Sequence, residues 1–404
     1  MIKMTNKKLK VGNFPNLRFP GFEGEWESKK LGEIADKVNS GKTPLGGEAV
    51  YTKEGVLFIR SQNVNNDKLE LDNSTFIPAS VNNQMKNSIV KPNDILLNIT
   101  GASLGRSCVA PNDFEIGNVN QHVCIIRLEK QYNPRFLQPL FSSKKGQIIF
   151  TSLQTGSGRE GLNFESIKGI KLFIPITDEQ QKISNFLCQI NERIQTQNKI
   201  IEELKLLKNT LSKKIFSGQL KFKDESGNDF PEWRMKEVGE IFKITRGNVL
   251  AMNLLTNNWS EETPYPVYSS QTKIKGLAGY YNKFLFENAI TWTTDGANAG
   301  DVNYRSGKFY CTNVCGVLLN KEGFANICVS ELINSVSKNY VSYVGNPKLM
   351  NGIMSKIKIE FPSLQEQAKI ANFLSSIDTK IDVEYQFLQE LKEQKKYLLA
   401  NLFI

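Results

Sequence analysis

The spacing of apolar residues divides the chain into two kinds of segment. Over 183–215 and 370–402, apolar side chains recur at intervals of four and three residues, which predicts long helices with a heptad seam. Each of these segments follows a proline and an acidic or amide-rich first turn, in "PITDEQ" and "PSLQEQ", as helix starts favour. Elsewhere, short apolar runs such as "GVLFIRSQNV" and "NAITWTT" are broken by Gly, Asn and Asp, which predicts strands joined by turns.

The two helical segments are copies of one another. "DEQQKISNFLCQI" begins at Asp178 and "QEQAKIANFLSSI" at Gln365, with eight identical letters and a register that holds for about forty residues. A second repeat lies upstream, where Trp26 in "EWESKKLGEI" corresponds to Trp233 in "EWRMKEVGEI". The chain is therefore a tandem duplication in which a variable strand-rich region is followed by a constant helix, twice.

This order predicts an α+β fold with two domains, each built on a twisted, mainly antiparallel sheet and carrying one more helix, near 134–153 and 325–343. We expect the two constant helices to pair as an antiparallel coiled coil, although two helices on separate cores would give the same pattern. The predicted boundaries are a tail over 1–15, a first domain over 16–176, a central helix over 177–222, a second domain over 223–362 and a C-terminal helix over 363–404.

The order of the parts is also circular. The sequence that leaves the first constant helix, "KIFSGQLKFKDESGNDFPEW", resembles the end of the chain, "NLFI", followed by its beginning, "NLRFPGFEGEW". A circular order implies a pseudo-twofold arrangement of the two copies. We therefore expect the two termini to lie close together.

Composition favours binding over catalysis. The net charge of +10 favours a polyanionic partner such as nucleic acid, and the single histidine, His122, rules out zinc sites built on paired histidines. The six cysteines include no C-x-x-C pair, which is typical of reduced thiols, and no stretch resembles a signal peptide or a membrane span, so we expect a soluble cytoplasmic protein. The motifs of amino-methyltransferases and nucleases are also missing from the sequence.

Two glycine-rich segments occupy matching places in the two strand-rich regions. "NITGASLGR" covers 98–106 and "TTDGANAGD" covers 293–301, each directly after a short apolar strand. Turns of this composition let a backbone approach phosphates or base edges closely, although either segment alone would also fit an ordinary hairpin turn. Their recurrence favours a role in contact with a partner.

Together these features resemble the specificity subunit of type I restriction-modification enzymes. The residues that carry the resemblance in the first copy are Trp26, Gly32, Glu33, Ile34, Leu162, Asn163, Pro175, Glu179, Gln180 and Ile183. Those in the second copy are Trp233, Gly239, Glu240, Ile241, Pro362, Glu366, Gln367 and Ile370. The second copy departs from the first at "LMNGIMSKI", which matches "GLNFESIKGI" only loosely, so Asn351 is not a clear equivalent of Asn163.

The resemblance implies a non-catalytic subunit in which each domain reads one half of a bipartite, asymmetric DNA sequence. The helices would set the spacer and dock two modification (methyltransferase) subunits, and restriction (translocase-nuclease) subunits would join them. S-adenosylmethionine, ATP and Mg²⁺ would then be used by those partners, with no cofactor or metal held by this chain. A helix of about 38 residues is ~57 Å long, enough to hold two domains over sites ~34 Å apart, one turn of DNA.

Polar residues in the predicted loops are the candidates for contact with DNA, because Arg pairs well with guanine and Asn or Gln with adenine. In the first domain they are Arg60, Gln62, Asn63, Thr100, Ser103, Arg106, Gln121, His122 and Arg159. In the second domain they are Ser269, Ser270, Gln271, Lys273, Lys275, Thr294, Asn298, Asn303, Arg305 and Lys348. Two alternatives stay open: a self-sufficient DNA methyltransferase or nuclease, and a coiled-coil scaffold whose basic charge is incidental.

Overall fold

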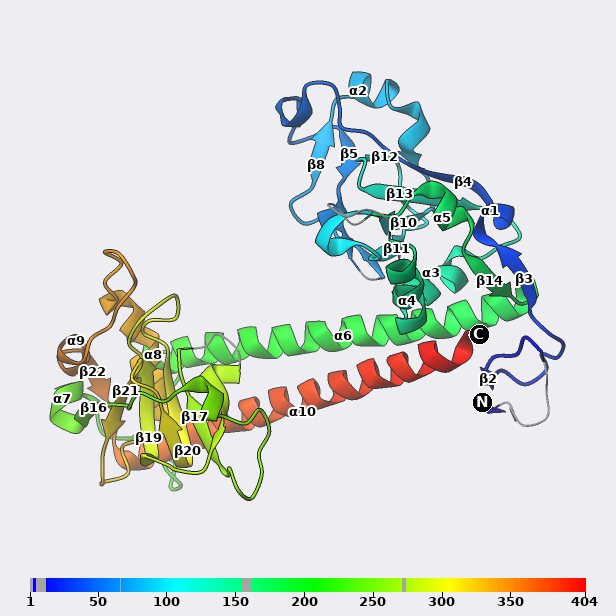
Figure 1. Cartoon of the computed structure of the whole chain (residues 1–404). Coiled ribbons are helices and arrows are strands. Elements are labelled where there is room, and N and C mark those ends of the chain that lie inside the picture. Colours follow the sequence, from blue (N-terminus) through cyan, green and yellow to red (C-terminus); the bar gives the residue numbers. More distant parts are fainter. Residues whose placement is uncertain (1–2, 5–11, 66, 155–160, 271–273) are drawn as a thin grey trace. The chain divides into compact units, whose positions relative to one another are not determined.

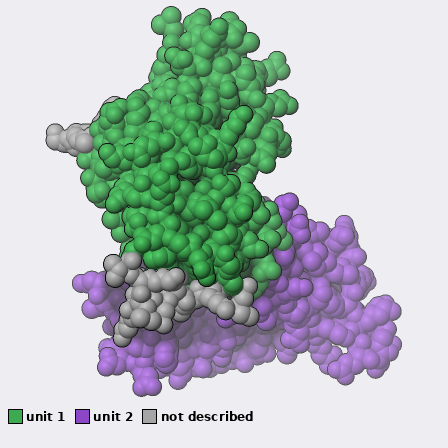
Figure 2. Space-filling view, turned by 90° about the vertical axis from the view of Figure 1, so that its right-hand side faces the viewer, with its two compact units in different colours: residues 1–198, 387–404 green, residues 199–386 purple. Residues whose placement is uncertain are grey.

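The computed structural model describes residues 3–4, 12–65, 67–154, 161–270 and 274–404. The chain forms two compact units, one of residues 1–198 with 387–404 and the other of residues 199–386 (Figures 1 and 2). Two long helices, α6 (Thr177–Phe216) and α10 (Leu364–Leu402), each contribute one end to each unit. Among the described residues, no helix combines the length and the apolar character that crossing a membrane requires.

The first unit contains two four-stranded sheets. One is entirely antiparallel and has the order β11-β10-β13-β4, from β4 (Ala35–Ser40), β10 (Ile95–Asn98), β11 (Ser107–Val109) and β13 (Val123–Leu128). The other has the order β8-β5-β12-β9, from β5 (Val56–Ile59), β8 (Thr75–Ile77), β9 (Ile89–Val90) and β12 (Gly117–Val119). Only β5 and β12 pair in parallel among these described strands.

Shorter elements complete the first unit. Its two-stranded pairs are β1 (Lys3–Met4) with β2 (Leu17–Arg18), β3 (Glu27–Lys30) with β14 (Lys171–Ile174), and β6 (Val64–Asn65) with β7 (Lys68–Leu69). Its short helices are α1 (Leu31–Ile34), α2 (Ala79–Asn83), α3 (Pro134–Ser142), α4 (Lys144–Ser152) and α5 (Phe164–Lys168).

The helix expected near 134–153 is divided in two. Ser143 leaves the helical conformation between α3 and α4, and its Oγ accepts a hydrogen bond from the backbone N–H of Gly146 at 3.2 Å. Serine is a favoured N-cap because its hydroxyl satisfies a backbone donor that the helix leaves open. The break is therefore encoded by a cap that helical periodicity alone does not reveal.

The second unit is built on one six-stranded sheet with the order β16-β21-β19-β20-β17-β18. Its strands are β16 (Lys243–Arg246), β17 (Tyr265–Tyr268), β18 (Leu277–Tyr281), β19 (Phe286–Thr293), β20 (Val302–Cys311) and β21 (Cys315–Leu319), and β17 with β20 is the parallel pair. A separate pair joins β15 (Arg234–Glu237) to β22 (Lys358–Phe361), and the helices are α7 (Val238–Ile241), α8 (Ile327–Ser337) and α9 (Asn351–Ser355). The two-domain α+β architecture with mainly antiparallel sheets is confirmed.

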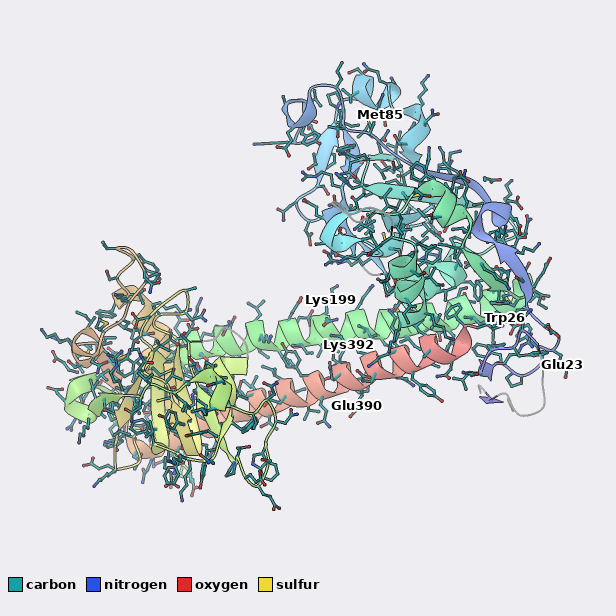
Figure 3. All side chains as sticks on the ribbon, viewed as in Figure 1. Glu23, Trp26, Met85, Lys199, Glu390 and Lys392 are labelled. Carbon is teal, nitrogen blue, oxygen red and sulfur yellow. The ribbon has the colours of Figure 1, made fainter. Side chains whose placement is uncertain are left out.

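The long helices belong to the cores of both units. In the first unit, Ile183 near the start of α6 shares a buried cluster with Leu402 at the end of α10 and with Trp26. In the second, Ile215 at the end of α6 packs in one cluster with Ile370 near the start of α10. Each unit thus joins the start of one helix to the end of the other, which is the antiparallel pairing predicted from the heptad seam. Polar side chains such as Lys199 and Glu390 lie on the exposed faces (Figure 3).

The beginning and the end of the described chain meet in the first unit. The Asn16 side-chain amide donates a hydrogen bond to Asn401 Oδ1 at 3.1 Å, and Leu17 and Phe403 are buried in the same core. The closeness that the circular order predicted is therefore confirmed.

Candidate nucleic-acid interface

The repeated Glu-Gln pair attaches each strand-rich domain to its helix. In the first unit, Gln180 Nε2 donates to the Pro175 carbonyl at 2.9 Å, which links the first turn of α6 to the end of the preceding strand. Gln180 Oε1 accepts from the backbone N–H of Asn133 at 2.9 Å, and the Asn133 side chain caps α3. One buried glutamine therefore joins α6, β14 and α3.

The second copy repeats this arrangement. Gln367 Nε2 donates to the Pro362 carbonyl at 2.9 Å, and Gln367 Oε1 accepts from Asn326 Nδ2 at 2.8 Å, where Asn326 caps α8. Both glutamines are buried, so their amide groups need internal partners. The likeness of the two copies follows from this local anchoring, which also fixes where each domain sits on its own end of the helix pair.

The adjacent glutamates differ in their partners. Glu179 forms a bidentate, buried ion pair with Arg18, with distances of 2.8 Å from Nε and 2.7 Å from a terminal guanidinium nitrogen. Its counterpart Glu366 accepts instead from the indole N–H of Trp233 at 2.8 Å. Burial raises the pKa of Glu366, an effect only partly offset by this hydrogen bond and by nearby Lys221. The same position of the repeat thus holds an ion-paired glutamate in the first unit and a buried glutamate without an ion-pair partner among the described residues in the second.

The "LGEI" and "VGEI" segments form equivalent short helices. The side chain of Glu33 accepts from the backbone N–H of Lys30 at 2.8 Å, and Glu240 accepts from that of Glu237 at 2.9 Å. The glycine of "LGEI" allows a close approach, because a Cβ on Gly32 would lie 2.9 Å from the Lys168 side chain. The same capping hydrogen bond therefore recurs at the start of α1 and α7.

The two glycine-rich segments, 98–106 and 293–301, have the same backbone structure. In both, the first residue donates its N–H to the ninth residue's carbonyl (2.8 and 3.0 Å), and the eighth donates to the first (2.9 Å in each). Glycine occupies the fourth and eighth positions with φ between +72° and +94°, a region that other residues enter at a cost. The recurrence seen in the sequence is therefore a recurrence in three dimensions.

The first of these loops borders a polar hollow of about 440 Å³ on the first unit, which we call the first-unit hollow. It is lined by Ser61, Gln62, Thr100, Gly101, Ala102, Ser103, Arg106 and His122. Five of the nine residues predicted for this domain are thus brought together, and no lining residue is acidic. A concave surface of hydroxyl, amide and guanidinium groups is suited to phosphates and base edges.

Hydrogen bonds hold the wall of the first-unit hollow in place. Thr100 Oγ1 lies 2.6 Å from His122 Nδ1, and the Gln121 amide nitrogen lies 3.1 Å from the other ring nitrogen of His122. Thr43 donates to Gln121 Oε1 at 2.7 Å, and exposed Arg106 donates to the Asn65 side chain at 3.2 Å. The predicted residue Gln121 therefore supports His122 from outside the hollow, and Asn65 is a contributor that the sequence did not reveal.

Two other predicted residues of the first domain, Arg60 and Asn63, do not line the hollow. Arg60 lies with its guanidinium 5.7 Å from the centre of the Tyr51 ring. Asn63 is buried and turned inward, because its side chain accepts from the Arg60 N–H at 3.0 Å and donates to the Glu70 carbonyl at 2.9 Å. Arg159 lies outside the described residues. The structure therefore gives Asn63 an internal hydrogen-bonding role in place of an outward one.

The second unit carries a polar hollow of about 310 Å³, the second-unit hollow. Four predicted residues line it: Ser269, Lys275, Asn303 and Arg305. The other lining residues are Gly276, Thr291, Trp292, Thr293, Asp301, Val302, Cys315 and Asn334. Two of these, Thr293 and Asp301, belong to the second glycine-rich segment, so matching loops border a hollow in both units.

Arg305 dominates the second-unit hollow. Only 7% of it is exposed, its guanidinium lies 3.7 Å from the centre of the Tyr268 ring, and it donates to Thr291 Oγ1 at 2.9 Å and to the Lys275 carbonyl at 2.7 Å. Burial lowers the pKa of Arg305, although arginine stays charged under all ordinary conditions. Tyr268, which supports the Arg305 guanidinium, was not predicted from the sequence, although it directly precedes the predicted Ser269 in "PYPVYSSQ".

The remaining predicted residues of the second domain have mixed positions. Thr294 is buried and donates to the Val314 carbonyl at 3.0 Å, so the structure turns its hydroxyl inward. Asn298 donates to the Ser270 carbonyl at 3.3 Å, which ties the glycine-rich loop to the loop after β17. Lys348 is exposed and pairs through its backbone with Ser342. Gln271 and Lys273 lie outside the described residues.

Among the residues that the structure describes, no three His, Cys, Asp or Glu side chains stand close enough together to hold a metal ion. The described cysteines Cys124 and Cys315 are buried, and burial raises the pKa of their thiols to about 12 and about 11. The thiolate form is the reactive one, so neither thiol is poised as a nucleophile.

Comparison with known proteins gives a consistent picture. The model of the type I restriction modification DNA specificity domain matches residues 23–206 and 231–393. A Mycoplasma pneumoniae protein named as a type I specificity subunit N-terminus is 37% identical over 143 residues, which cover 35% of this chain and 75% of that protein. A Methanocaldococcus jannaschii protein named as the specificity subunit of the type I restriction enzyme MjaX is 24% identical, over 98% of this chain and 95% of its own length.

Solved structures show the same fold. The S subunit of a type I restriction-modification system from M. genitalium aligns with a TM-score of 0.60 and 19% identity, covering 98% of both chains. A chain from a structural study of the assembly and conformational transition of a type I system aligns with a TM-score of 0.55 and 14% identity, covering 93% of this chain and 96% of that one.

Proposed function

Because the chain belongs to the family defined by the type I restriction modification DNA specificity domain, we propose that its two domains each read one half of a bipartite, asymmetric DNA sequence. The observation that carries this proposal is the duplication of one loop geometry, 98–106 and 293–301, beside a polar hollow in each unit. The two hollows are lined by different side chains, so the two half-sites would differ in sequence. Read together, they specify an asymmetric target.

The chemistry of the hollows fits base and phosphate recognition. Gln62 and Arg106 in the first-unit hollow, and Asn303 and Arg305 in the second, are the side-chain types that pair in bidentate fashion with adenine and guanine. Each good pair of this kind contributes ~1–3 kcal/mol of discrimination against the wrong base. The net charge of +10 adds a sequence-independent attraction to phosphate that weakens as salt rises.

The chain would supply recognition while other subunits supply catalysis. In this division of labour, two modification subunits dock on the helix pair and carry S-adenosylmethionine, and restriction subunits use ATP and Mg²⁺. The base to be methylated would leave the DNA stack and enter a pocket of a modification subunit. This chain would hold the duplex in register while that happens.

Reconstitution tests the proposal. The purified chain is mixed with its modification subunits, a labelled methyl donor and a random-sequence DNA library, and the modified molecules are sequenced. We expect methylation at a two-part sequence with a fixed gap, and only when the chain and its modification subunits are both present. Methyl transfer or cleavage by the chain alone would support a self-sufficient enzyme, and methylation without any sequence preference would support a scaffold.

A further inference from the structure

Two equivalent lysines each stand where a recognition domain meets the helix pair. Lys208 in α6 and Lys395 in α10 are separated by 187 residues, the offset of the helical repeat, so they occupy the same position in the two copies. Their side chains are largely buried, with 13% and 16% exposed. An ammonium group that is removed from water needs charged or hydrogen-bonding partners.

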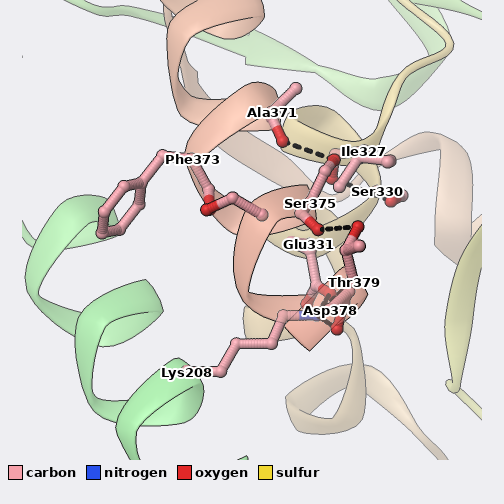
Figure 4. Close-up of polar contacts among 10 residues, drawn as sticks. Lys208, Ile327, Ser330, Glu331, Ala371, Phe373, Ser375, Asp378 and Thr379 are labelled. Carbon is pink, nitrogen blue, oxygen red and sulfur yellow. Dashed lines mark hydrogen bonds and ion pairs between the residues drawn. The ribbon is translucent and has the colours of Figure 1, made fainter. Parts of the chain in front are cut away.

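Lys208 is held by carboxylates from two different elements of the second unit (Figure 4). Its Nζ lies 2.7 Å from Glu331 Oε1 on α8, and 2.9 and 2.8 Å from the two carboxylate oxygens of Asp378 on α10. Burial lowers the pKa of Lys208, but the charge of Glu331 and the hydrogen bonds to both acids raise it more, so the net shift is upward. One ammonium thus joins both long helices to the domain.

Lys395 joins α10 to the first domain through a different acid. It pairs with Asp67 Oδ2 in the turn between β6 and β7, and Asp67 Oδ1 accepts a hydrogen bond from Gln138 on α3 at 2.8 Å. Gln138 and Glu331 are equivalent, because each lies five residues after the Asn that caps its helix. The residue equivalent to Asp378 in the first copy is Asn191.

The comparison of the two copies is informative because the partners changed while the lysine did not. The two acids around Lys208 are replaced by two amides, Gln138 and Asn191, and the first domain brings a new acid, Asp67, to Lys395. Solubility of the helices does not require lysines at these two positions, since exposed lysines such as Lys213 and Lys396 already provide surface charge. In both units, a largely buried lysine on a long helix pairs with an acid of the domain, and this pairing constrains where that domain sits.

We propose that Lys208 and Lys395 are positioning residues that hold each recognition domain in one orientation on its own end of the helix pair, and so restrict the DNA target to one spacer length. This inference rests on the proposed function. A tilt of either domain on its helices would separate the ammonium from its carboxylate and leave both partly buried and unpaired, which is costly. Each domain is therefore held in a single orientation on its end of the helix pair.

The experiment measures spacer tolerance in the reconstituted complex of this chain with its modification subunits. The DNA substrates carry the two half-sites separated by the preferred spacer or by one base pair more or less. In the Lys208→Met and Lys395→Met variants we expect the preference for the correct spacer to fall about tenfold, since the loss of a partly buried ion pair frees the domain to tilt. The matched controls, Lys213→Met and Lys396→Met, remove exposed lysines from the same helices and should keep the preference.

Two further variants separate positioning from mere stability. Lys208→Arg keeps the charge and should keep most of the spacer preference, whereas Glu331→Gln with Asp378→Asn removes the acids and should lose it. Uniformly reduced methylation at every spacer, with the preference unchanged in Lys208→Met and Lys395→Met, would overturn the inference and leave the lysines with a stabilising role only. A wild-type complex without any preference for paired half-sites would instead overturn the proposed function, and the inference with it.

Discussion

The equivalent glutamates Glu179 and Glu366 should respond to different extents to the same substitution. Glu179→Gln removes the charge that faces Arg18, whose side chain is only 9% exposed, and breaking a buried ion pair on one side costs ~3–5 kcal/mol. The guanidinium keeps two backbone acceptors, the carbonyls of Gly24 at 2.6 Å and Glu23 at 3.3 Å, so we expect the lower end, about 3 kcal/mol. A unit of this size loses ~2–4 °C for each kcal/mol, which predicts a fall of about 6–12 °C in its melting temperature.

Glu366→Gln should be nearly neutral. Its partner is the neutral indole N–H of Trp233 at 2.8 Å, which an amide oxygen accepts equally well, and burial already disfavours the charged carboxylate. We expect a change within ~1 kcal/mol. Hydrogen exchange with mass spectrometry along a thermal or urea gradient reports each unit from its own peptides, and exposed Glu192→Gln on α6 is the matched control. Equal destabilisation by the two substitutions, or a neutral Glu179→Gln, would refute the reasoning.

Two further predictions concern the second unit. Gly316→Ala should destabilise it by ~1–3 kcal/mol because the new Cβ would lie 2.1 Å from the ring of buried Trp292. The control Gly352→Ala on α9 places a Cβ with nothing within 4 Å and should be neutral or stabilising. Chemical denaturation followed by tryptophan fluorescence measures both. Burial raises the pKa of Glu366 above 4.5, so its favourable contribution is present below pH 4.5 and is lost as pH rises through the raised value. The stability of the second unit should therefore fall less over this interval in Glu366→Gln than in the wild type, and an identical pH profile would contradict the assignment.

The repeated parts of the fold could be predicted from the sequence because their signals are periodic or duplicated. The heptad seam predicted α6 and α10, and the circular order predicted that the two ends of the chain lie close together, as Asn16 and Asn401 do. The role of the Glu-Gln pair could not be predicted, because it depends on Asn133 and Asn326, which approach it only through tertiary contacts. Periodicity says which face of a helix is buried, not which distant polar group will meet it.

The candidate interface was predictable only in part for a similar reason. The glycine-rich loops carry a local signal, since left-handed φ values demand glycine, and both form as matching turns. Whether a polar side chain beside a loop points outward depends on which backbone groups it can satisfy. Gln62 and Arg106 line a hollow, whereas Asn63 and Thr294 bond to carbonyls inside their domains.

In the proposed function, each unit reads its own half of the DNA target. The most direct measurement is the methylated sequence produced by the reconstituted complex when one hollow at a time is altered, by Gln62→Ala with Arg106→Ala in the first unit or by Asn303→Ala in the second. We expect the first variant to relax one half-site, the second to relax the other, and the spacer to stay the same. Changes in both half-sites from a variant in a single unit, or in neither from both variants, would contradict it.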